Sequence, residues 1–542
     1  MTSDLREMGW IPVLRLDGGR ELVGLRELFA RAEEFSDLAP ELTCQRDAVL
    51  RLALAILWSA VRVEGPDDWA DLVESGDWSE QVLDYLDAPE GRWDLFDEEA
   101  PFFQTPSLRT AKGTHSGLEK LILDVPAGEQ MFIGRQRSSY ESISAREAAL
   151  WLVTVMAFDP SGIKTGAVGD VHAKGGKGYP MGTAAAGRFH LVVALGETLA
   201  ETLMLNLMPR ETEPLAGADS EEDRPAWERP VPTAERQERL PDGPVDLLTW
   251  QSRRIRLVRE GGRMVGVIIA NGDAFSEQNA HQVEPFSIWR YSDPQTKKAG
   301  RTVFMPLMVD PAVQIWRGVS RLLGAVPGGP SKYPAPPAPA VVNWIGELAV
   351  MGKIDVAPRR FRASGVEYGT QSAVVSDLVD DSLALPVAAL SAGQPAVSGL
   401  LVEGVEAAEQ GVRALGRLAA NLARAAGDRD DLSRDAGESA SRAARQQGFA
   451  ALDAPVRAWI ASVDPAELDS CRRAWFAEAR GILRDLGAEM VRTAPPAAWV
   501  PRESDAMDVP RADHYFQRAL HTAFSLPDEP TTAAEEAARA DR

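Results

Sequence analysis

The chain has 542 residues, of which 45% are hydrophobic and 25% are charged, and its only cysteines, Cys44 and Cys471, lie far apart. These values describe an ordinary soluble protein and argue against a disulfide framework or a cysteine-based zinc cluster. No apolar run reaches about 18 residues and the N-terminus lacks an apolar signal core, so we expect a cytoplasmic protein of several domains without a membrane span.

The formal net charge of −22 is unfavourable for nucleic-acid binding, because phosphate contacts require lysine and arginine. Binding, however, depends on a local patch rather than on the charge summed over the whole surface. Part of the acid is concentrated in the Pro-rich segment 209–244, which we expect to be an exposed connection. The charge argues against a chain that binds nucleic acid alone and is compatible with one that does so within a larger assembly.

The first part of the chain indicates a strand at 11–16 and several helices. The nearly continuous apolar run at 48–57 predicts a buried helix. Ser144 followed by Glu147 predicts a capping box at the start of a helix over 144–157. Residues 158–183 then form a long Gly-rich loop, and loops of that length tend to be functional or disordered.

Two strands around Gly261-Gly262, at 253–259 and 263–269, predict a hairpin whose arginine-rich first strand is a local basic signal. From about residue 381 amphipathic helices follow, with further helices expected at 442–462, 466–492 and 511–525. We therefore predict an α+β fold with a mixed domain over 1–380, a four-helix bundle over 381–526 and a disordered tail over 527–542. The first helix of the bundle has a heptad-like seam of Val405, Ala408, Val412, Leu415, Ala419 and Leu422.

The stretch A-K-G-G-K-G-Y-P-M-G-T at 173–183 is the main candidate binding element. Glycine lets a backbone pass close to a bulky group, and the flanking lysines suggest that this group is anionic. Neither the phosphate-binding loop G-x-x-x-x-G-K-[ST] nor the dinucleotide fingerprint G-x-G-x-x-G occurs, which argues against a nucleotide site. A flexible surface turn with solvated lysines is the alternative.

The residues that catalysis requires do not occur as a set. The chain has six histidines but no H-E-x-x-H pair, no G-x-S-x-G elbow and no distinctive pair of carboxylates. We therefore predict a protein that is not an enzyme and that holds no metal or cofactor. Two alternatives stay open: an enzyme whose lysine–glycine loop binds a phosphorylated small molecule, and a purely structural protein-binding adaptor.

Six short motifs occur in an order that resembles a known family. They are W-I-P-V at 10–13, A-P-F-F-Q-T at 100–105, F-D-P-S-G-I-K at 158–164, G-G-K-G-Y-P-M-G-T at 175–183, T-L-M-L-N-L at 202–207 and D-L-L-T-W-Q-S-R-R-I-R-L at 246–257. Together with the C-terminal helices they resemble, over the whole chain, the large subunit (CasA) of the type I-E CRISPR Cascade surveillance complex.

The resemblance implies a non-catalytic subunit in antiviral defence. Its partners would be the backbone, handle-end and small subunits of Cascade, the CRISPR RNA and double-stranded target DNA. The implied role is to recognise the protospacer-adjacent motif (PAM) from the minor groove, to start the unwinding that leads to an R-loop, and to help recruit a helicase–nuclease. The guide RNA reads the rest of the target by base pairing.

The resemblance also assigns residues to DNA contacts. A glycine backbone can enter a minor groove only about 6 Å wide, and lysines beside it can pair with the bordering phosphates. The stretch E-Y-G-T-Q-S-A-V-V at 367–375 places Gln371, with Thr370 beside it, as a wedge that splits the first base pair. The glycine loop comprises Lys174, Gly175, Gly176, Lys177 and Gly178, of which Gly175 and Gly178 match the family best.

Two further assignments follow from the resemblance. The stretch 277–289, which corresponds to a lysine finger in the family, contains no lysine, so we expect His281 or Gln282, or the nearby pair Lys297 and Lys298, to contact DNA there. The stretch E-Q-M-F-I-G-R-Q-R at 129–137 resembles a loop that contacts the 5′ handle of the guide RNA. Stacking and cation pairing suit single-stranded RNA, and the residues assigned to them are Phe132, Arg135 and Arg137.

Overall fold

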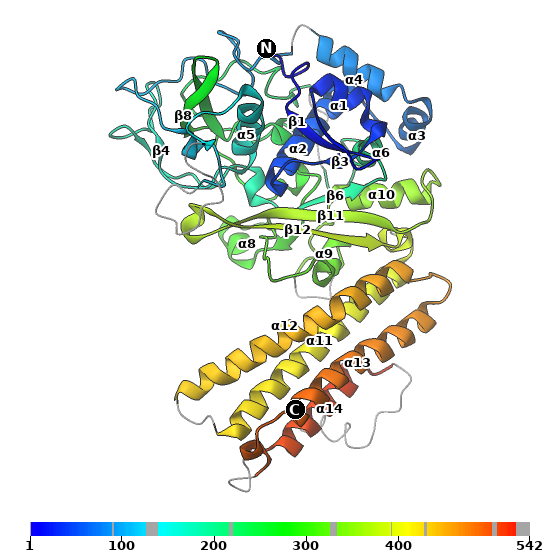
Figure 1. Cartoon of the computed structure of the whole chain (residues 1–542). Helices are drawn as coiled ribbons and strands as arrows, with labels where there is room; N and C mark the ends of the chain where they lie inside the picture. The colour runs from blue at the N-terminus through cyan, green and yellow to red at the C-terminus, as the bar shows by residue number, and fades with distance from the viewer. Residues whose placement is uncertain are drawn as a thin grey trace. The chain divides into compact units, whose positions relative to one another are not determined.

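The computed structural model describes residues 2–88, 91–125, 139–215, 221–325, 333–391, 393–427, 431–500 and 507–526. The chain divides into two compact units. The first comprises Met1–Ile315, Arg321–Gly324 and Lys332–Leu383, and the second comprises Trp316–Ser320, Ala325–Ser331 and Ala384–Arg542. The first unit mixes helices and strands and the second is helical (Figure 1), so the predicted α+β class is confirmed. The predicted tail at 527–542 lies outside the described residues.

The first unit begins with an antiparallel sheet of order β2-β1-β3 followed by helices. The predicted buried helix is confirmed as α2, whose apolar run is hidden from solvent along most of its length. The elements are β1 (Ile11–Arg15), β2 (Arg20–Val23), α1 (Leu25–Ala30), β3 (Phe35–Leu38), α2 (Thr43–Ala60), α3 (Pro66–Ser75) and α4 (Trp78–Asp87).

Helix α5 (Ala145–Phe158) packs against α2 and leads into the Gly-rich loop. The predicted cap is confirmed, because the Ser144 side chain accepts a hydrogen bond from the Glu147 backbone nitrogen at 3.2 Å. The helix ends at Phe158, so the loop starts from a rigid, buried element. Two short strands, β4 (Lys164–Thr165) and β5 (Lys177–Gly178), interrupt the loop.

A second antiparallel sheet has the order β12-β11-β6 and contains the wedge segment. Strands β11 (Arg359–Tyr368) and β12 (Val375–Leu385) form a long hairpin, and β6 (Leu191–Leu195) pairs with β11. Strand β12 continues beyond residue 381, where the helical region was expected to begin, because Leu383 and Leu385 are buried at strand spacing. Helices α6 (Leu199–Leu205) and α10 (Ala340–Val350) contact this sheet.

The predicted hairpin around Gly261-Gly262 is confirmed as β7 (Arg253–Glu260) and β8 (Arg263–Asn271). Both glycines have positive φ, +56° and +82°, as a two-residue hairpin turn requires. Further helices and strands between residues 244 and 322 are α7 (Pro244–Leu248), β9 (Trp289–Tyr291), α8 (Asp293–Ala299), β10 (Phe304–Pro306) and α9 (Val319–Leu322).

The acidic segment 209–244 is exposed only in part, because buried residues alternate with exposed ones along it. Leu215 and Trp227 are buried, and the carboxylate of Asp223 accepts hydrogen bonds from Arg210 at 3.0 Å and from the Asp246 backbone nitrogen at 2.9 Å. Arginines neutralise part of the acid, so the segment can pack against the rest of the first unit.

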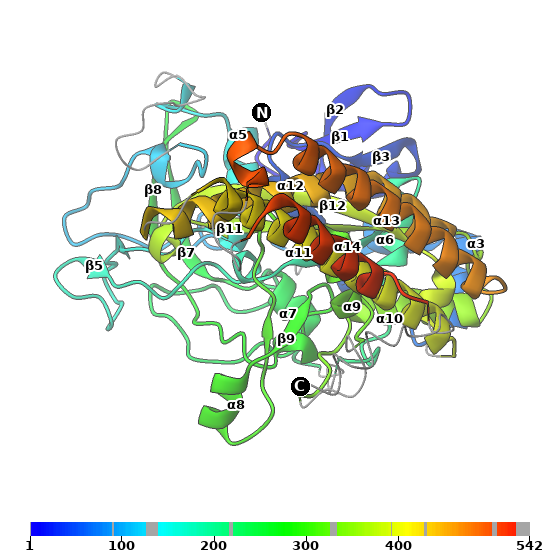
Figure 2. The ribbon, with the colours of Figure 1, turned by 90° about the horizontal axis from the view of Figure 1, so that it is seen from below.

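In the described part of the second unit the long helices are α11 (Pro395–Ala426), α12 (Asp431–Ser462), α13 (Leu468–Arg492) and α14 (Val509–Ala523). Helix α11 packs against each of the other three, and Figure 2 shows α11, α13 and α14 side by side. The predicted seam is buried except at Ala419. Among the described residues, no helix combines the length and apolar character that a bilayer crossing requires.

Candidate nucleic-acid interface

The lysine–glycine stretch forms a tight hairpin turn at residues 174–177, which we call the glycine turn. Lys174 and Lys177 exchange two backbone hydrogen bonds, with N–O distances of 2.9 and 3.1 Å. Between them, Gly175 and Gly176 have φ of +60° and +73°. Positive φ at both central positions is the geometry of a type I′ turn, which glycine adopts without strain. All four residues are exposed.

The base of this hairpin is closely packed. A Cβ added to Gly166 would lie 2.4 Å from the carbonyl carbon of Gly176. Gly178 is buried, and an added Cβ there would lie 2.9 Å from the Asn271 side-chain nitrogen, which donates to the Tyr179 carbonyl at 2.8 Å. Gly178 therefore holds the hairpin against β8, and the part of the predicted glycine loop that faces solvent is the glycine turn itself.

The glycine turn presents positive charge and open space. The lysine ion pairs among the described residues involve Lys164, Lys297 and Lys353, so the ammonium groups of Lys174 and Lys177 are unpaired in this part of the structure. A Cβ built on either central glycine would meet no atom within 4 Å. The turn can therefore approach an anionic surface with its backbone first.

A buried ion cluster fixes both ends of the Gly-rich loop. The Arg253 guanidinium, only 3% exposed, donates to the Asp159 carboxylate and to the carbonyls of Pro160 at 3.3 Å and Gly182 at 2.9 Å. The Lys164 ammonium lies 2.5 Å from the same carboxylate. Burial lowers the pKa of Lys164, although the Asp159 carboxylate opposes this shift. The cluster holds the loop that carries the glycine turn.

The local basic signal predicted for the arginine-rich strand is wrong for its first two arginines. Arg253 and Arg254 are both buried, and Arg254 lies 2.5 Å from the Asp273 carboxylate. These guanidinium groups pair with internal acids rather than contribute to a positive surface. Unpaired cations occur instead on the glycine turn, at Lys174 and Lys177.

The turn between β11 and β12, residues 369–374, is the wedge turn. It contains a 3₁₀ turn (Thr370–Ser372), in which Thr370 and Gln371 are exposed. Gln371 and Ser372 have φ of +56° and +54°. Side chains in this conformation cost on the order of 1–3 kcal/mol each and tend to occur where function requires them. Gly369 closes the turn by donating to the Val374 carbonyl at 2.9 Å.

One hydrogen bond joins the wedge turn to the loop that carries the glycine turn, and a second joins the last residue of β11 to the last residue of α5. The Ser161 backbone nitrogen donates to the Ser372 carbonyl at 2.7 Å, and the Tyr368 hydroxyl donates to the Phe158 carbonyl at 2.8 Å. Burial raises the pKa of Tyr368, so its hydroxyl stays a donor. Figure 1 shows β4 and the wedge turn on the same side of the first unit. The structure therefore connects the wedge turn to the start of the loop that carries the glycine turn.

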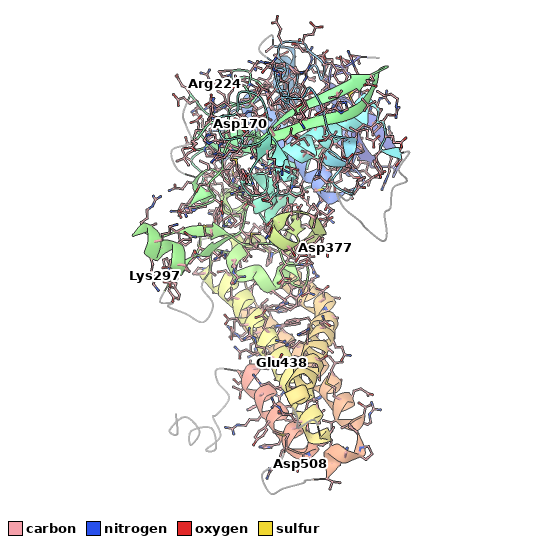
Figure 3. The ribbon with its side chains drawn as sticks, turned by 90° about the vertical axis from the view of Figure 1, so that its left-hand side faces the viewer. Asp170, Arg224, Lys297, Asp377, Glu438 and Asp508 are labelled. Atoms are coloured by element: carbon pink, nitrogen blue, oxygen red, sulfur yellow. The ribbon has the colours of Figure 1, made fainter. Side chains whose placement is uncertain are left out.

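The residues predicted to replace the lysine finger take no part in these contacts. The half-buried His281 ring packs edge-on against Trp289 and Phe304, at centroid distances of 5.6 and 5.4 Å, and burial lowers its pKa to about 4. Lys297 lies 2.6 Å from Asp293 on α8, next to the exposed Lys298. Figure 3 shows Lys297 well apart from Asp377 of β12. The predicted contacts of Phe132, Arg135 and Arg137 lie outside the described residues.

The sequence did not point to Ser161, Gly166 or Tyr368. Ser161 acts through its backbone nitrogen, so its side-chain type carries no signal. The spacing of glycines in the loop could have drawn attention to Gly166, but only the structure shows that Gly166 packs against the backbone of Gly176. Among the described residues, no group of three or more His, Cys, Asp or Glu side chains could hold a metal ion.

The fold and the site define a two-unit α+β protein whose prominent exposed features are backbone turns and unpaired lysines. The chain belongs to the family of the CRISPR-associated protein Cse1, whose model matches residues 4–486. The membership predicted from the six motifs is therefore confirmed.

Known relatives agree with this assignment. The crystal structure of Cse1 from Thermobifida fusca is 37% identical, has a TM-score of 0.87, and is matched over 96% of this chain and 98% of that one. Cse1 from Acidimicrobium ferrooxidans is 29% identical with a TM-score of 0.81, over 97% and 98% of the two chains.

A curated relative, CasA/Cse1 from Thermus thermophilus, is 30% identical over 271 residues, which are 46% of this chain and 48% of that protein. This chain thus matches about half the length of that curated relative. A chain of a CRISPR RNA-guided surveillance complex is similar in fold, with 20% identity and a TM-score of 0.66 over 96% of this chain and 99% of that one.

Proposed function

We propose that this chain is the non-catalytic large subunit of a CRISPR RNA-guided DNA surveillance complex. In this role it recognises the PAM in double-stranded DNA from the minor groove, starts unwinding and helps recruit a helicase–nuclease. Its partners are the other Cascade subunits, the CRISPR RNA and the target DNA. One observation carries the proposal: two adjacent glycines, flanked by unpaired lysines, present a bare backbone to open solvent.

The glycine turn suits a minor groove for steric and electrostatic reasons. The groove is only about 6 Å wide, so a strip of main chain without Cβ atoms reaches further into it than side chains do. Lys174 and Lys177 stand on either side of that strip, where the phosphates of the two strands border the groove. A net charge of −22 does not prevent this, because the contact depends on the local potential.

The wedge turn suits the next step, the separation of the first base pair. Unstacking one step costs on the order of a few kcal/mol, which the inserted group must offset. The amide of Gln371 can both donate to and accept from freed base edges. Its positive φ is held by hydrogen bonds within the turn and by Ser161, so the amide is presented by a fixed backbone.

The test must distinguish a turn whose glycines contact DNA from a turn that requires glycine only for its backbone conformation. Asn is well tolerated at the first central position of a type I′ turn, so Gly175→Asn keeps the backbone and adds a side chain at the tip. Gly261→Asn makes the same change in the same kind of turn between β7 and β8 and is the matched control.

The complex is reconstituted with guide RNA and partner subunits, and binding to motif-bearing and motif-less duplexes is compared. We expect Gly175→Asn to weaken motif-dependent binding by about tenfold or more, roughly 1.4 kcal/mol, while assembly is unchanged. Gly261→Asn should bind as the wild type does. Equal binding by all three proteins would contradict a groove-reading role for the glycine turn and would favour the protein-binding adaptor.

The enzyme alternative makes a separate prediction. A chain whose lysine–glycine loop binds a phosphorylated small molecule should be stabilised by that ligand in a thermal-shift screen. We expect no shift with ATP or NAD. A large shift that Gly175→Asn abolishes would favour the enzyme alternative over DNA recognition.

A further inference from the structure

We propose that the cavity beside the wedge turn receives one unpaired nucleobase from the opened DNA, an inference that rests on the proposed function. The cavity has a volume of ≈ 570 Å³. Its walls come from three segments, residues 116–125, residues 159–165 and residues 373–378 at the end of the wedge turn and the start of β12, together with Ile269 of β8. Sites for small ligands have volumes of roughly 300–1,000 Å³, so one nucleobase fits with room for its sugar.

The cavity lies where a base would leave the duplex. Ser161, which lines it, donates to Ser372 of the wedge turn, and Ala373 and Val374 of the same turn form part of its wall. Strand β4, which also lines the cavity, pairs with β5, the strand that ends the glycine hairpin. The cavity is therefore attached to both elements that we propose hold the DNA.

The walls match a flat aromatic group with polar edges. Leu123, Val125 and Ile269 supply apolar surface, and Thr165 and Ser376 add hydroxyl groups. A base displaced from its stack needs both kinds of contact, apolar packing for its faces and hydrogen bonds for its edges.

Apolar side chains at this cavity also face solvent. Ile163 is 59% exposed and Val374 is 47% exposed, and both line the cavity. Exposed apolar residues that gather at one concave site, rather than singly over a surface, indicate a binding surface.

The charges of the cavity select a neutral base over a phosphate. Glu119, Asp124, Asp159 and Asp377 contribute carboxylates to its lining against the cations Lys120 and Lys164, and this excess of negative charge repels a phosphate group. The ammonium of Lys164, in the same lining, is occupied by Asp159 at 2.5 Å. A nucleobase carries no charge at neutral pH, so it enters without this repulsion while its phosphates stay outside.

The base comes from the displaced strand. In RNA-guided recognition the guide pairs with one DNA strand, so bases of that strand exchange one partner for another. The first base of the displaced strand loses its partner and gains none, and extruding a base costs a few kcal/mol. A cavity that packs this base would stabilise the opened state.

Photocrosslinking in the reconstituted complex tests the assignment. 5-Iododeoxyuridine replaces the first base after the motif in the displaced strand or, as an internal control, in the strand that pairs with the guide. We expect the displaced-strand probe to crosslink to peptides within 116–125, 159–165 or 373–378, and the guide-paired probe to crosslink elsewhere.

Two cavity-filling variants come from different walls, Val375→Trp of β12 and Leu123→Trp. Both should lose the crosslink. Val356→Trp makes the same change at a position that is 87% exposed, just before β11, and should keep it. Two walls are used because either variant alone could disturb folding.

Permanganate reactivity of thymines in the displaced strand, read in the same complexes, separates this proposal from the proposed function. If the wild type neither binds the motif nor opens the duplex, both are overturned. If the wild type opens the duplex but the probe crosslinks outside the three segments, the nucleobase site alone is wrong. It is equally wrong if both tryptophan variants keep the crosslink.

Discussion

Replacing Arg253 should disturb the candidate interface most, although this arginine is buried and forms no part of the exposed surface. Its guanidinium, 3% exposed, donates to the Asp159 carboxylate and to the carbonyls of Ser252 at 2.9 Å, Pro160 at 3.3 Å and Gly182 at 2.9 Å. Arg253→Met keeps a long apolar stem but removes every one of these donors. The variant therefore isolates the ion cluster from the packing around it.

The expected loss of unfolding free energy follows from the Asp159 carboxylate, which stays buried after its arginine partner is removed. Removing one partner of a buried ion pair costs roughly 3–5 kcal/mol, because the other charge stays buried. Lys164, 2.5 Å from Asp159, still neutralises part of that charge, which places the expected loss near the lower limit, about 3 kcal/mol. Because the anchors lie at both ends of the loop, residues 159–182 should also open locally at lower free energy.

Urea unfolding measures the global effect, and hydrogen exchange of peptides within 159–182 measures the local one. Arg256→Met is the control: Arg256 is exposed on the same strand, where it donates to the Leu108 carbonyl at 3.2 Å, and its loss should cost less than about 1 kcal/mol. A similarly small loss for Arg253→Met, with unchanged exchange in the loop, would refute the view that the cluster holds the glycine turn in place.

Two further predictions concern strain and pH. Gln371→Gly removes a side chain from a positive-φ position and so relieves roughly 1–2 kcal/mol of strain. Glycine loses more backbone entropy on folding, which offsets about half of that gain. The stability of the fold should therefore be unchanged or slightly higher, while duplex opening slows. Thermal unfolding and permanganate footprinting check this, and opening at the wild-type rate would contradict the wedge role. His190 is buried, with no hydrogen-bond partner for either ring nitrogen among the described residues, and burial lowers its pKa to about 4. Because the folded state disfavours protonation, stability should fall by about 3 kcal/mol as pH drops from 6.5 to 4, and His190→Leu should remove that dependence in urea titrations. The exposed His514→Leu is the control, and an unchanged pH profile in His190→Leu would contradict the assignment.

Local sequence patterns identified several regular elements and the family. The apolar run of α2, the Ser144 cap of α5 and the Gly-Gly turn between β7 and β8 depend on residues within a few positions of one another, so composition and spacing were sufficient. The six ordered motifs likewise lie in continuous stretches. For the candidate site, local signals pointed to the glycine turn, whereas Gln371 was assigned only through the family resemblance.

Only the tertiary structure decided which charges and glycines are available to a partner. Arg253 and Asp159 are separated by 94 positions, so nothing near Arg253 in the sequence reveals that its charge is buried and paired. Gly178 resembles Gly175 in the sequence, yet Asn271 covers the first and open solvent surrounds the second. The bond between Ser161 and Ser372 joins two loops through backbone atoms, which every residue type carries. Burial and pairing arise between distant segments, and a linear pattern contains no record of which segments meet.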